Sequence, residues 1–282
     1  MKYLSLNSYS QSNFKIFNSN GNIFINKYPK KFDDREIDSI NKQNSFISYP
    51  LKRFIICSAK IDLNQHKKNF YSMEYFNGKS GANILLNGNV HEVNILRDYF
   101  YNLFYVKYKK LNFFQIDRDI VYSKIAEIEN KIRNNKENKF FIKKVIPLIK
   151  KKLKKTLYYP TERSCHGDLT LGNIIVNLKE KRIILIDFQK TYNDNITQDL
   201  AKIYQEFELN WTSRYFSSIL KTRALIVYSS ILNNDFWKNL DKNLKTSLNF
   251  EIYITLLRIL PYLKENDVIT KNWLVKSFNR LL

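Results

Sequence analysis

The sequence is poor in the residues that build stapled or extended chains. Its 282 residues contain two cysteines, five prolines and six glycines. Two cysteines cannot form a disulfide framework, and no paired cysteine and histidine spacing predicts a zinc site. The scarcity of glycine and proline excludes collagen-like and linker-rich chains. The length suffices for one large domain or two smaller lobes with a buried core.

Long hydrophobic runs are lacking as well. The first five residues are followed mainly by Asn, Ser and Gln, which do not fit the apolar core of a signal peptide. The longest apolar stretches, Ala224–Tyr228 and Ile252–Leu263, are too short or too interrupted to span a bilayer. We therefore expect a soluble, cytoplasmic protein.

Acidic residues are few relative to basic ones. The chain has 26 Asp and Glu against 47 Lys and Arg, a net charge of +21. Such an excess favours anionic partners, although the abundance of Lys, Asn, Ile and Phe throughout also fits a coding bias. The segment 131–155 holds eleven basic residues and one acid. It is either a solvated helix face or a platform for an anionic or membrane-associated acceptor. Without an aromatic–basic RNA-binding pattern, we do not expect nucleic acid as a partner.

The first 76 residues are typical of a strand-rich lobe. Two short β-prone runs, Phe14–Phe17 and Asn22–Tyr28, flank a turn that contains Gly21. Apolar residues at helical spacing predict a short helix over Asp33–Lys42, and Arg53–Ala59 and Asn69–Phe76 read as further strands. We predict a nucleotide-binding N-lobe of sheet and helix over residues 1–76.

Beyond the break at Asn77–Gly81 the pattern turns helical. Helices are expected over Val93–Leu111, over Asp119–Arg133 and over 139–157, where Pro147 should kink an amphipathic helix. After a hairpin at 174–188, the chain from Gln198 to its end again reads as helical. We predict a C-lobe over residues 77–282.

The hairpin carries the informative residues. The apolar runs Ile174–Leu178 and Arg182–Ile186 are separated by three polar residues, which predicts an antiparallel pair. Such a pair places Asn173, just before the first strand, beside Asp187, just after the second. An amide oxygen and a carboxylate suit Mg²⁺. Asp168, five residues before Asn173, reaches the same cavity and is suited to accept a hydroxyl proton.

The spacing of these residues resembles that of a known group of enzymes. His166-Gly167-Asp168 is followed by four residues and Asn173, and Asp187 follows fourteen residues later within Ile-Asp-Phe. This pattern closely resembles the aminoglycoside phosphotransferase and choline kinase family. The resemblance implies an α+β, protein-kinase-like, two-lobed fold with a small β-rich N-lobe and a mainly helical C-lobe that holds the catalytic hairpin. It also implies that Asp168 is the catalytic base, that Asn173 and Asp187 bind the metal, and that His166 supports the loop.

Other parts of the chain match the family less closely. The resemblance implies that Glu74 and Tyr75 belong to the hinge strand that pairs with adenine. Lys27 resembles the strand cation that contacts the nucleotide phosphates, and Glu36 resembles the helix carboxylate that orients it. Alternatives remain at both positions: for Lys27 they are Lys30 and Lys31, and for Glu36 they are Asp33, Asp34 and Asp38.

Two further positions complete the resemblance. The expected phosphate loop, Ser8–Lys15, contains no glycine, so Ser10 and Ser12 together with backbone N–H groups would cradle the phosphates. Asp199 resembles the family's acidic residue that supports the catalytic loop. An Asp in the first turn of a helix capped by Thr197 is the competing explanation.

The resemblance implies an ATP- and Mg²⁺-dependent phosphotransferase that acts on a hydroxyl of a sugar, an amino-alcohol or an aminoglycoside-like acceptor. The C-terminal region is not notably acidic, which argues against a polycationic antibiotic and favours a neutral or anionic sugar. One alternative is a nucleotide-binding protein without catalysis, suggested by the missing loop glycines. Another is a kinase of a carrier- or lipid-linked surface glycan.

Overall fold

The computed structural model describes residues 13–19, 22–29, 31–62, 69–103, 112–135, 138–153, 156–160, 165–232 and 235–282. The chain forms two compact units. The first unit comprises the described residues up to Leu96 together with Leu171–Thr191, and the second comprises those of Arg97–Thr170 and Tyr192–Leu282.

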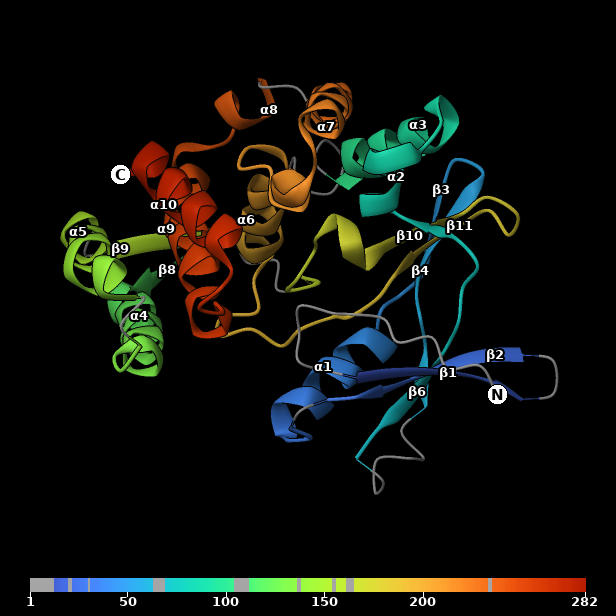
Figure 1. Cartoon of the computed structure of the whole chain (residues 1–282), viewed down its shortest axis with the longest axis horizontal. Helices are drawn as coiled ribbons and strands as arrows, with labels where there is room; N and C mark the ends of the chain where they lie inside the picture. The colour runs from blue at the N-terminus through green and yellow to red at the C-terminus, as the bar shows by residue number, and fades with distance from the viewer. Residues whose placement is uncertain are drawn as a thin grey trace. The chain divides into compact units, whose positions relative to one another are not determined.

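A four-stranded sheet forms one part of the first unit, in the order β1-β2-β6-β5 (Figure 1). The strands pair antiparallel, and Phe17 of β1 lies opposite Phe24 of β2 with their rings stacked. The predicted strands in this region are confirmed. The four strands are β1 (Asn13–Ser19), β2 (Asn22–Tyr28), β5 (Ile61–Asp62) and β6 (Tyr71–Glu74).

Helix α1 (Asp34–Asn44) confirms the predicted short helix. The Asp33 carboxylate caps it by accepting a hydrogen bond from the Glu36 backbone N–H at 3.2 Å. On its buried face, the Gln43 side chain donates to the carbonyl of Ala59 at 2.6 Å and accepts from the Phe188 N–H at 3.1 Å. Gln43 thereby ties α1 to the chain that follows Asp187.

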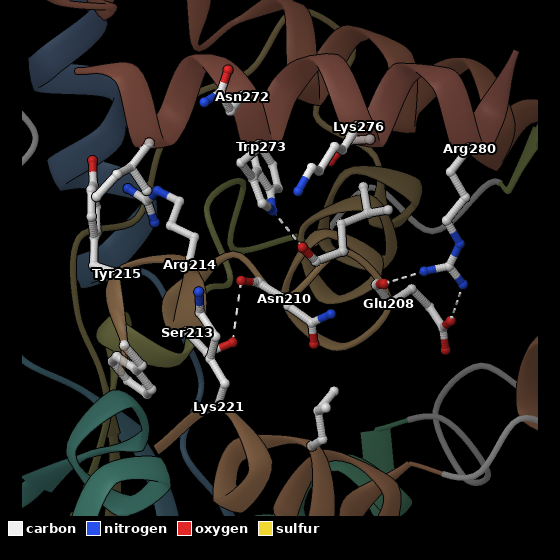
Figure 2. Close-up of a pocket in the computed structure, with 15 residues that line it drawn as sticks. Glu208, Asn210, Ser213, Arg214, Tyr215, Lys221, Asn272, Trp273, Lys276 and Arg280 are labelled. Atoms are coloured by element: carbon white, nitrogen blue, oxygen red, sulfur yellow. Dashed lines mark hydrogen bonds and ion pairs between the residues drawn. The ribbon is translucent and has the colours of Figure 1, made fainter. Parts of the chain in front are cut away.

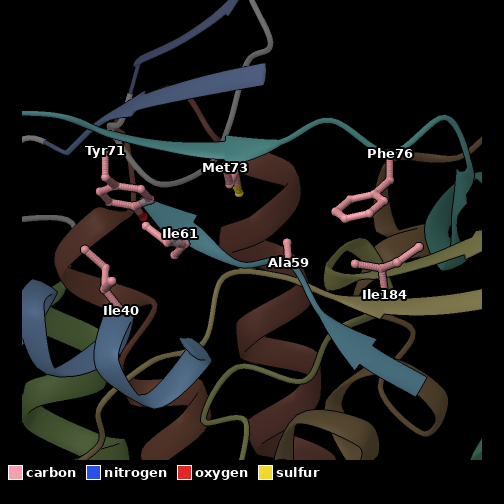
Figure 3. Packing of buried hydrophobic residues seen from close by; sticks show 7 residues of the cluster. All are labelled: Ile40, Ala59, Ile61, Tyr71, Met73, Phe76 and Ile184. Carbon is pink, nitrogen blue, oxygen red and sulfur yellow. The ribbon is translucent and has the colours of Figure 1, made fainter. Parts of the chain in front are cut away.

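The core of the first unit lies between α1 and the strands (Figure 3). Tyr71 and Met73 of β6 point toward Ile61 of β5, and Phe76 lies beside Ile184. Burial of such side chains is the main stabilising contribution to a fold of this kind. The cluster consists of Ile40, Ala59, Ile61, Tyr71, Met73, Phe76 and Ile184.

A second sheet of the first unit contains the predicted hairpin. Strand β10 (Ile174–Asn177) pairs antiparallel with β11 (Arg182–Leu185), so the hairpin prediction is confirmed. β11 also pairs in parallel with β4, and β10 pairs with β7, giving the order β3-β4-β11-β10-β7. The remaining strands are β3 (Tyr49–Leu51), β4 (Phe54–Ser58) and β7 (Lys79–Ser80).

The pairing of β11 with β4 decides where the hairpin belongs. It groups Leu171–Thr191 with the N-terminal part of the chain, and the first unit also keeps α2 (Gly81–Asn87) and the start of α3 (Val90–Tyr101). The sequence division at residue 77 assigned all of these residues to the C-lobe. As a statement about functional lobes, that division stays a prediction.

The helix expected over 139–157 differs from the structure at its C-terminal end. A π-helical turn, Phe141–Val145, leads into α5 (Ile146–Lys152), and Leu157 lies in strand β9 (Thr156–Pro160). The π-turn ends where Pro147, which has no N–H to donate, enters the first turn of α5. Leu157 and Tyr159 are buried while Tyr158 between them is exposed, which is the alternation of a strand.

Strand β9 pairs with β8 (Phe113–Asp117), a two-stranded sheet that the sequence did not indicate. The other elements of the second unit are helical, and α6 packs against the largely buried α9. No helix among the described residues is long and apolar enough to cross a membrane. These helices are α4 (Arg118–Ile132), α6 (Ile196–Phe207), α7 (Ser218–Ile231), α8 (Asp235–Lys238), α9 (Lys242–Leu257) and α10 (Val268–Leu281).

The predicted α+β class is confirmed: the N-terminal region is built on β-sheets and the C-terminal part is mostly helical.

Candidate functional site

The loop that carries Asp168 is fastened by its backbone to helix α6. The N–H groups of His166 and Gly167 donate to the two carboxylate oxygens of Asp199, at 2.7 and 2.8 Å. Gly167 has φ of 85°, a left-handed conformation that a side chain would strain. Asp199 is buried in the first turn of α6, so its charge also lies near the positive end of the helix dipole.

The cap of α6 differs from the sequence expectation. Asn195, rather than Thr197, is the N-cap, and its side-chain oxygen accepts from the Thr197 N–H at 3.0 Å. Asp199 occupies the first turn, as both interpretations of this position require, and it also binds the loop. A helical role alone therefore does not account for Asp199.

Asp168 itself is paired with a lysine. Lys202 Nζ lies 2.8 Å from Asp168 Oδ1. Burial alone would raise the pKa of Asp168, but the charges of Lys202, Arg258 and His166 and the hydrogen bond from Lys202 hold that pKa below its ordinary value. The carboxylate is therefore ionised at neutral pH. Because Lys202 follows Asp199 by three positions, both project from the same side of α6.

A buried carboxyl group organises the chain just ahead of α6. Glu251 Oε1 accepts hydrogen bonds from the hydroxyl groups of Tyr159 and Tyr192 and from the Asn193 amide. Burial raises the pKa of Glu251, although these hydrogen bonds oppose the shift. The cluster joins β9, α9 and the segment that leads into the Asn195 cap of α6.

In the first unit, two predicted site carboxylates meet around the predicted lysine, Lys27. Lys27 Nζ lies 2.6 Å from Asp187 Oδ1 and 3.6 Å from Glu36 Oε1. Burial lowers the pKa of Lys27, but the charges of Asp187 and Glu36 and the hydrogen bond to Asp187 outweigh it and raise the pKa overall. The Tyr71 hydroxyl donates to Glu36 Oε1 at 3.0 Å. Lys27 is therefore held as a cation between carboxylates.

The alternatives to these residues are placed elsewhere. Lys31 is exposed and lies 3.5 Å from Asp33, and Asp33 caps α1. Lys30 lies outside the described residues, as do Ser10 and Ser12 of the expected phosphate loop. Among the described candidates, Lys27 and Glu36 are the pair that the fold brings to Asp187.

The open end of the hairpin presents the two expected metal ligands. The Ile186 N–H donates to the Asn173 carbonyl at 3.1 Å, so the two chains are still paired at this point. Asp187 follows with φ of 60°, an unusual conformation for a residue with a side chain, and this turns it out of the strand direction.

The donor set at this end fits Mg²⁺. One carboxylate and one amide oxygen are hard ligands, and Mg²⁺ bound to phosphates typically takes only one or two protein ligands. Among the described residues there is no cluster of three or more His, Cys, Asp or Glu that could hold a metal without phosphate ligands. The residues therefore fit a magnesium ion that arrives with a nucleotide.

The expected hinge residues end strand β6. Glu74 is exposed and pairs in register with Phe24, and the Tyr75 N–H donates to the Ile23 carbonyl at 2.9 Å. That N–H is therefore occupied by β2. An adenine base that docks here would therefore pair with other backbone groups of this segment. The hinge role of Glu74 and Tyr75 stays a prediction.

Two residues at the site escaped the sequence reasoning. Lys202 pairs with Asp168 and Tyr71 binds Glu36. The signal for Lys202 was present, because a lysine three positions after Asp199 shares its helix face. Tyr71 gave no comparable signal, since a tyrosine at the start of a strand is most simply read as core.

Residues 138–225 match the family described as "Phosphotransferase enzyme family". No curated protein matches the chain. Among solved structures, a choline/ethanolamine kinase family protein from Mesorhizobium loti is 10% identical, covers 100% of this chain and 87% of its own, and has a TM-score of 0.47.

Two aminoglycoside phosphotransferases are similar to a comparable extent. APH(4)-Ia is 9% identical over 99% of this chain and 92% of its own, with a TM-score of 0.46. APH(2")-IIIa, solved as a GDP and kanamycin complex, is 13% identical over 99% and 91%, with a TM-score of 0.47. The family match covers the segment with His166, Asp168, Asn173, Asp187 and Asp199, and the resemblance of this segment to the phosphotransferase family is thereby confirmed.

Proposed function

We propose that the chain is a phosphotransferase that uses ATP and Mg²⁺ to phosphorylate a hydroxyl group of a small molecule. The observation that carries the proposal is the ionised Asp168, paired with Lys202 on a loop anchored by Asp199, within the segment that matches the phosphotransferase family. The cluster of Lys27, Glu36 and Asp187 supports it from the first unit.

Asp168 acts as the base. Its carboxylate accepts the proton of the acceptor hydroxyl while the hydroxyl oxygen forms a bond to the γ-phosphorus and the bond to the β,γ-bridging oxygen breaks, leaving ADP. A carboxylate with a low pKa is a weak base, so the main contribution of Asp168 is to orient the acceptor hydroxyl. It takes the proton as the hydroxyl becomes more acidic during transfer.

The cluster of Lys27, Glu36 and Asp187 belongs to the nucleotide site. Lys27 contacts the α- and β-phosphates, and Glu36, held by Tyr71, orients it. Asn173 and Asp187 would hold Mg²⁺, which would supply positive charge to neutralise the phosphates. Ser10, Ser12, Glu74 and Tyr75 belong to the same proposal as phosphate-loop and hinge residues.

The acceptor is a neutral or anionic sugar, free or attached to a carrier. The excess of basic residues supports this class over a polycationic antibiotic. A carrier- or lipid-linked acceptor has one specific support: Lys143, Lys144 and Lys151 of the basic segment are exposed, whereas Lys150 is paired with Glu129 at 2.7 Å.

The test is thermal unfolding against ATP, with and without Mg²⁺. Ligand at about a hundred times its dissociation constant adds roughly 2.7 kcal/mol to the stability. We expect a Mg²⁺-dependent rise in Tm that the substitution Asp187→Asn removes. Asp38 is an exposed residue on α1, so the control substitution Asp38→Asn should leave the rise intact. A chain that responds to neither ATP nor GTP would contradict the proposal.

An acceptor panel then separates the substrate classes. Sugars, sugar phosphates, choline and an aminoglycoside are each incubated with the chain and γ-labelled ATP. Turnover of choline or the aminoglycoside without turnover of any sugar would overturn the acceptor assignment and leave the phosphotransferase assignment standing.

A further inference from the structure

A pocket of about 540 Å³ opens in the second unit (Figure 2). Its walls are the segment after α6, from Glu208 to Phe216, the first turns of α7, and one side of α10. Glu208 follows Asp199 by nine positions, which corresponds to about 14 Å along a helix. The pocket therefore lies at the opposite end of α6 from the loop of Asp168, and none of its residues belongs to the site described above.

The charge of the lining is strongly positive. The lining holds four basic side chains and one carboxylate, that of Glu208. Glu208 already lies 3.0 Å from Arg280 Nη2; the other basic residues are Arg214, Lys221 and Lys276. No ion pair joins Lys221 or Lys276 to a carboxylate among the described residues, and both lysines are exposed. Two cations at the mouth thus remain available to an anion.

The pocket also has an aromatic and apolar side. Trp273 lines it, with its indole N–H donating to the Leu209 carbonyl, so the ring is fixed in place. Arg214 is nearly buried, with its guanidinium 3.4 Å from the ring centre of Trp211 and 4.3 Å from that of Tyr215. Such a rigid wall suits the flat, C–H-rich face of a ring.

One further feature adds to the positive charge of the pocket. Helix α7 begins at the pocket with no side-chain cap from Ser217 and no acid in its first turn. Its free N–H groups add to the positive potential there.

We propose that this pocket binds an anionic monosaccharide, with the sugar ring against Trp273 and its phosphate or carboxylate between Lys221 and Lys276. The aromatic wall suits the C–H face of a sugar ring, and the cations select the negative group. The proposal does not rest on the phosphotransferase activity, because binding is measured without nucleotide.

The test is calorimetric titration of the full chain with glucose 6-phosphate, glucuronate, glucose and inorganic phosphate. We expect at least one of the two anionic sugars to bind at least tenfold more tightly than glucose and than phosphate. The preferred one distinguishes a phosphate from a carboxylate ligand. Equal affinity for glucose and the anionic sugars, tighter binding of inorganic phosphate than of either, or no binding of either anionic sugar overturns the proposal.

A charge-matched pair of variants locates the binding. Lys221→Glu with Lys276→Glu is expected to weaken binding at least tenfold. Lys242→Glu with Lys264→Glu changes the net charge equally at exposed positions outside the pocket and is expected to leave the binding unchanged. All four positions are exposed, so circular dichroism should show the same fold. Equal affinity in the two double variants would place the site elsewhere and overturn the assignment.

Discussion

The two units each present an aspartate beside a lysine, and they do so in opposite ways. In the first unit Lys27 is the buried partner, with 8% of its side chain exposed, and it faces two carboxylates from different elements. In the second unit Asp168 faces one lysine, and the aspartate's own loop is fastened through backbone N–H groups to Asp199.

The difference shows which group each arrangement fixes. A buried cation between Asp187 and Glu36 is positioned by its counter-charges, so the cluster fixes a positive charge. The loop in the second unit is positioned by hydrogen bonds to its backbone, so it fixes a negative charge whatever happens to Lys202. Removing a partner should therefore disturb the first unit more in stability and the second more in pH dependence.

The largest effect is expected from Asp168→Asn. An amide cannot accept the hydroxyl proton, and general base catalysis contributes about 10²–10⁴-fold, so phosphate transfer should fall by about that factor. The loop anchors of Asp199 remain, so the Tm and the Mg-ATP response should stay close to those of the unchanged chain. Transfer at the original rate would show that Asp168 is not the base.

Lys27→Met should lower stability and nucleotide affinity together. It leaves Asp187 and Glu36 without their shared cation in a partly buried site, for which we expect about 2–3 kcal/mol less stability in urea unfolding. The pKa of Lys27 is raised in the fold, so its stabilisation is complete at pH 7 and is lost only at alkaline pH.

The exposed Lys31 provides the control for that variant. Lys31→Met should change stability by less than about 0.5 kcal/mol. Similar losses in the two variants would show that the burial of Lys27 carries no special weight, and would break the contrast between the units.

Lys202→Met should change the pH profile more than the stability. The pKa of Asp168 is held down, so its ionised form stabilises the fold above the ordinary pKa near 3.8, and this contribution is lost as the pH falls through the lower folded pKa. Without Lys202 the pKa of Asp168 rises, and the acid limb of the kcat/KM profile should move to higher pH. An unmoved limb would mean that another group sets it.

The smallest effect is expected from Glu36→Gln. Lys27 keeps its closer partner Asp187, and Gln can still accept from the Tyr71 hydroxyl, so stability should fall by about 1 kcal/mol or less. The KM for ATP should rise a few-fold if Glu36 orients Lys27. Asp38→Asn, two residues later on the same helix, is the matched control and should leave the KM unchanged.

Much of the fold was predictable because the signals are local. Hairpins and short helices follow from runs of apolar residues and the turns between them, and β1, β2, α1, β10 and β11 all formed where they were expected. The helix predicted around Leu157 was wrong for the same reason. Its apolar spacing fits a helix and a strand, and pairing with β8 decided between them.

The sequence by itself determined the hairpin and the spacing that makes Asn173 and Asp187 neighbours, since both depend on bonds between residues close in the chain. Only the tertiary structure decided that Lys27 rather than Lys31 reaches Asp187, that Lys202 pairs with Asp168, and that a cationic pocket forms beside α10. Those contacts join residues far apart in sequence, and their free energies depend on burial and geometry that no local pattern encodes.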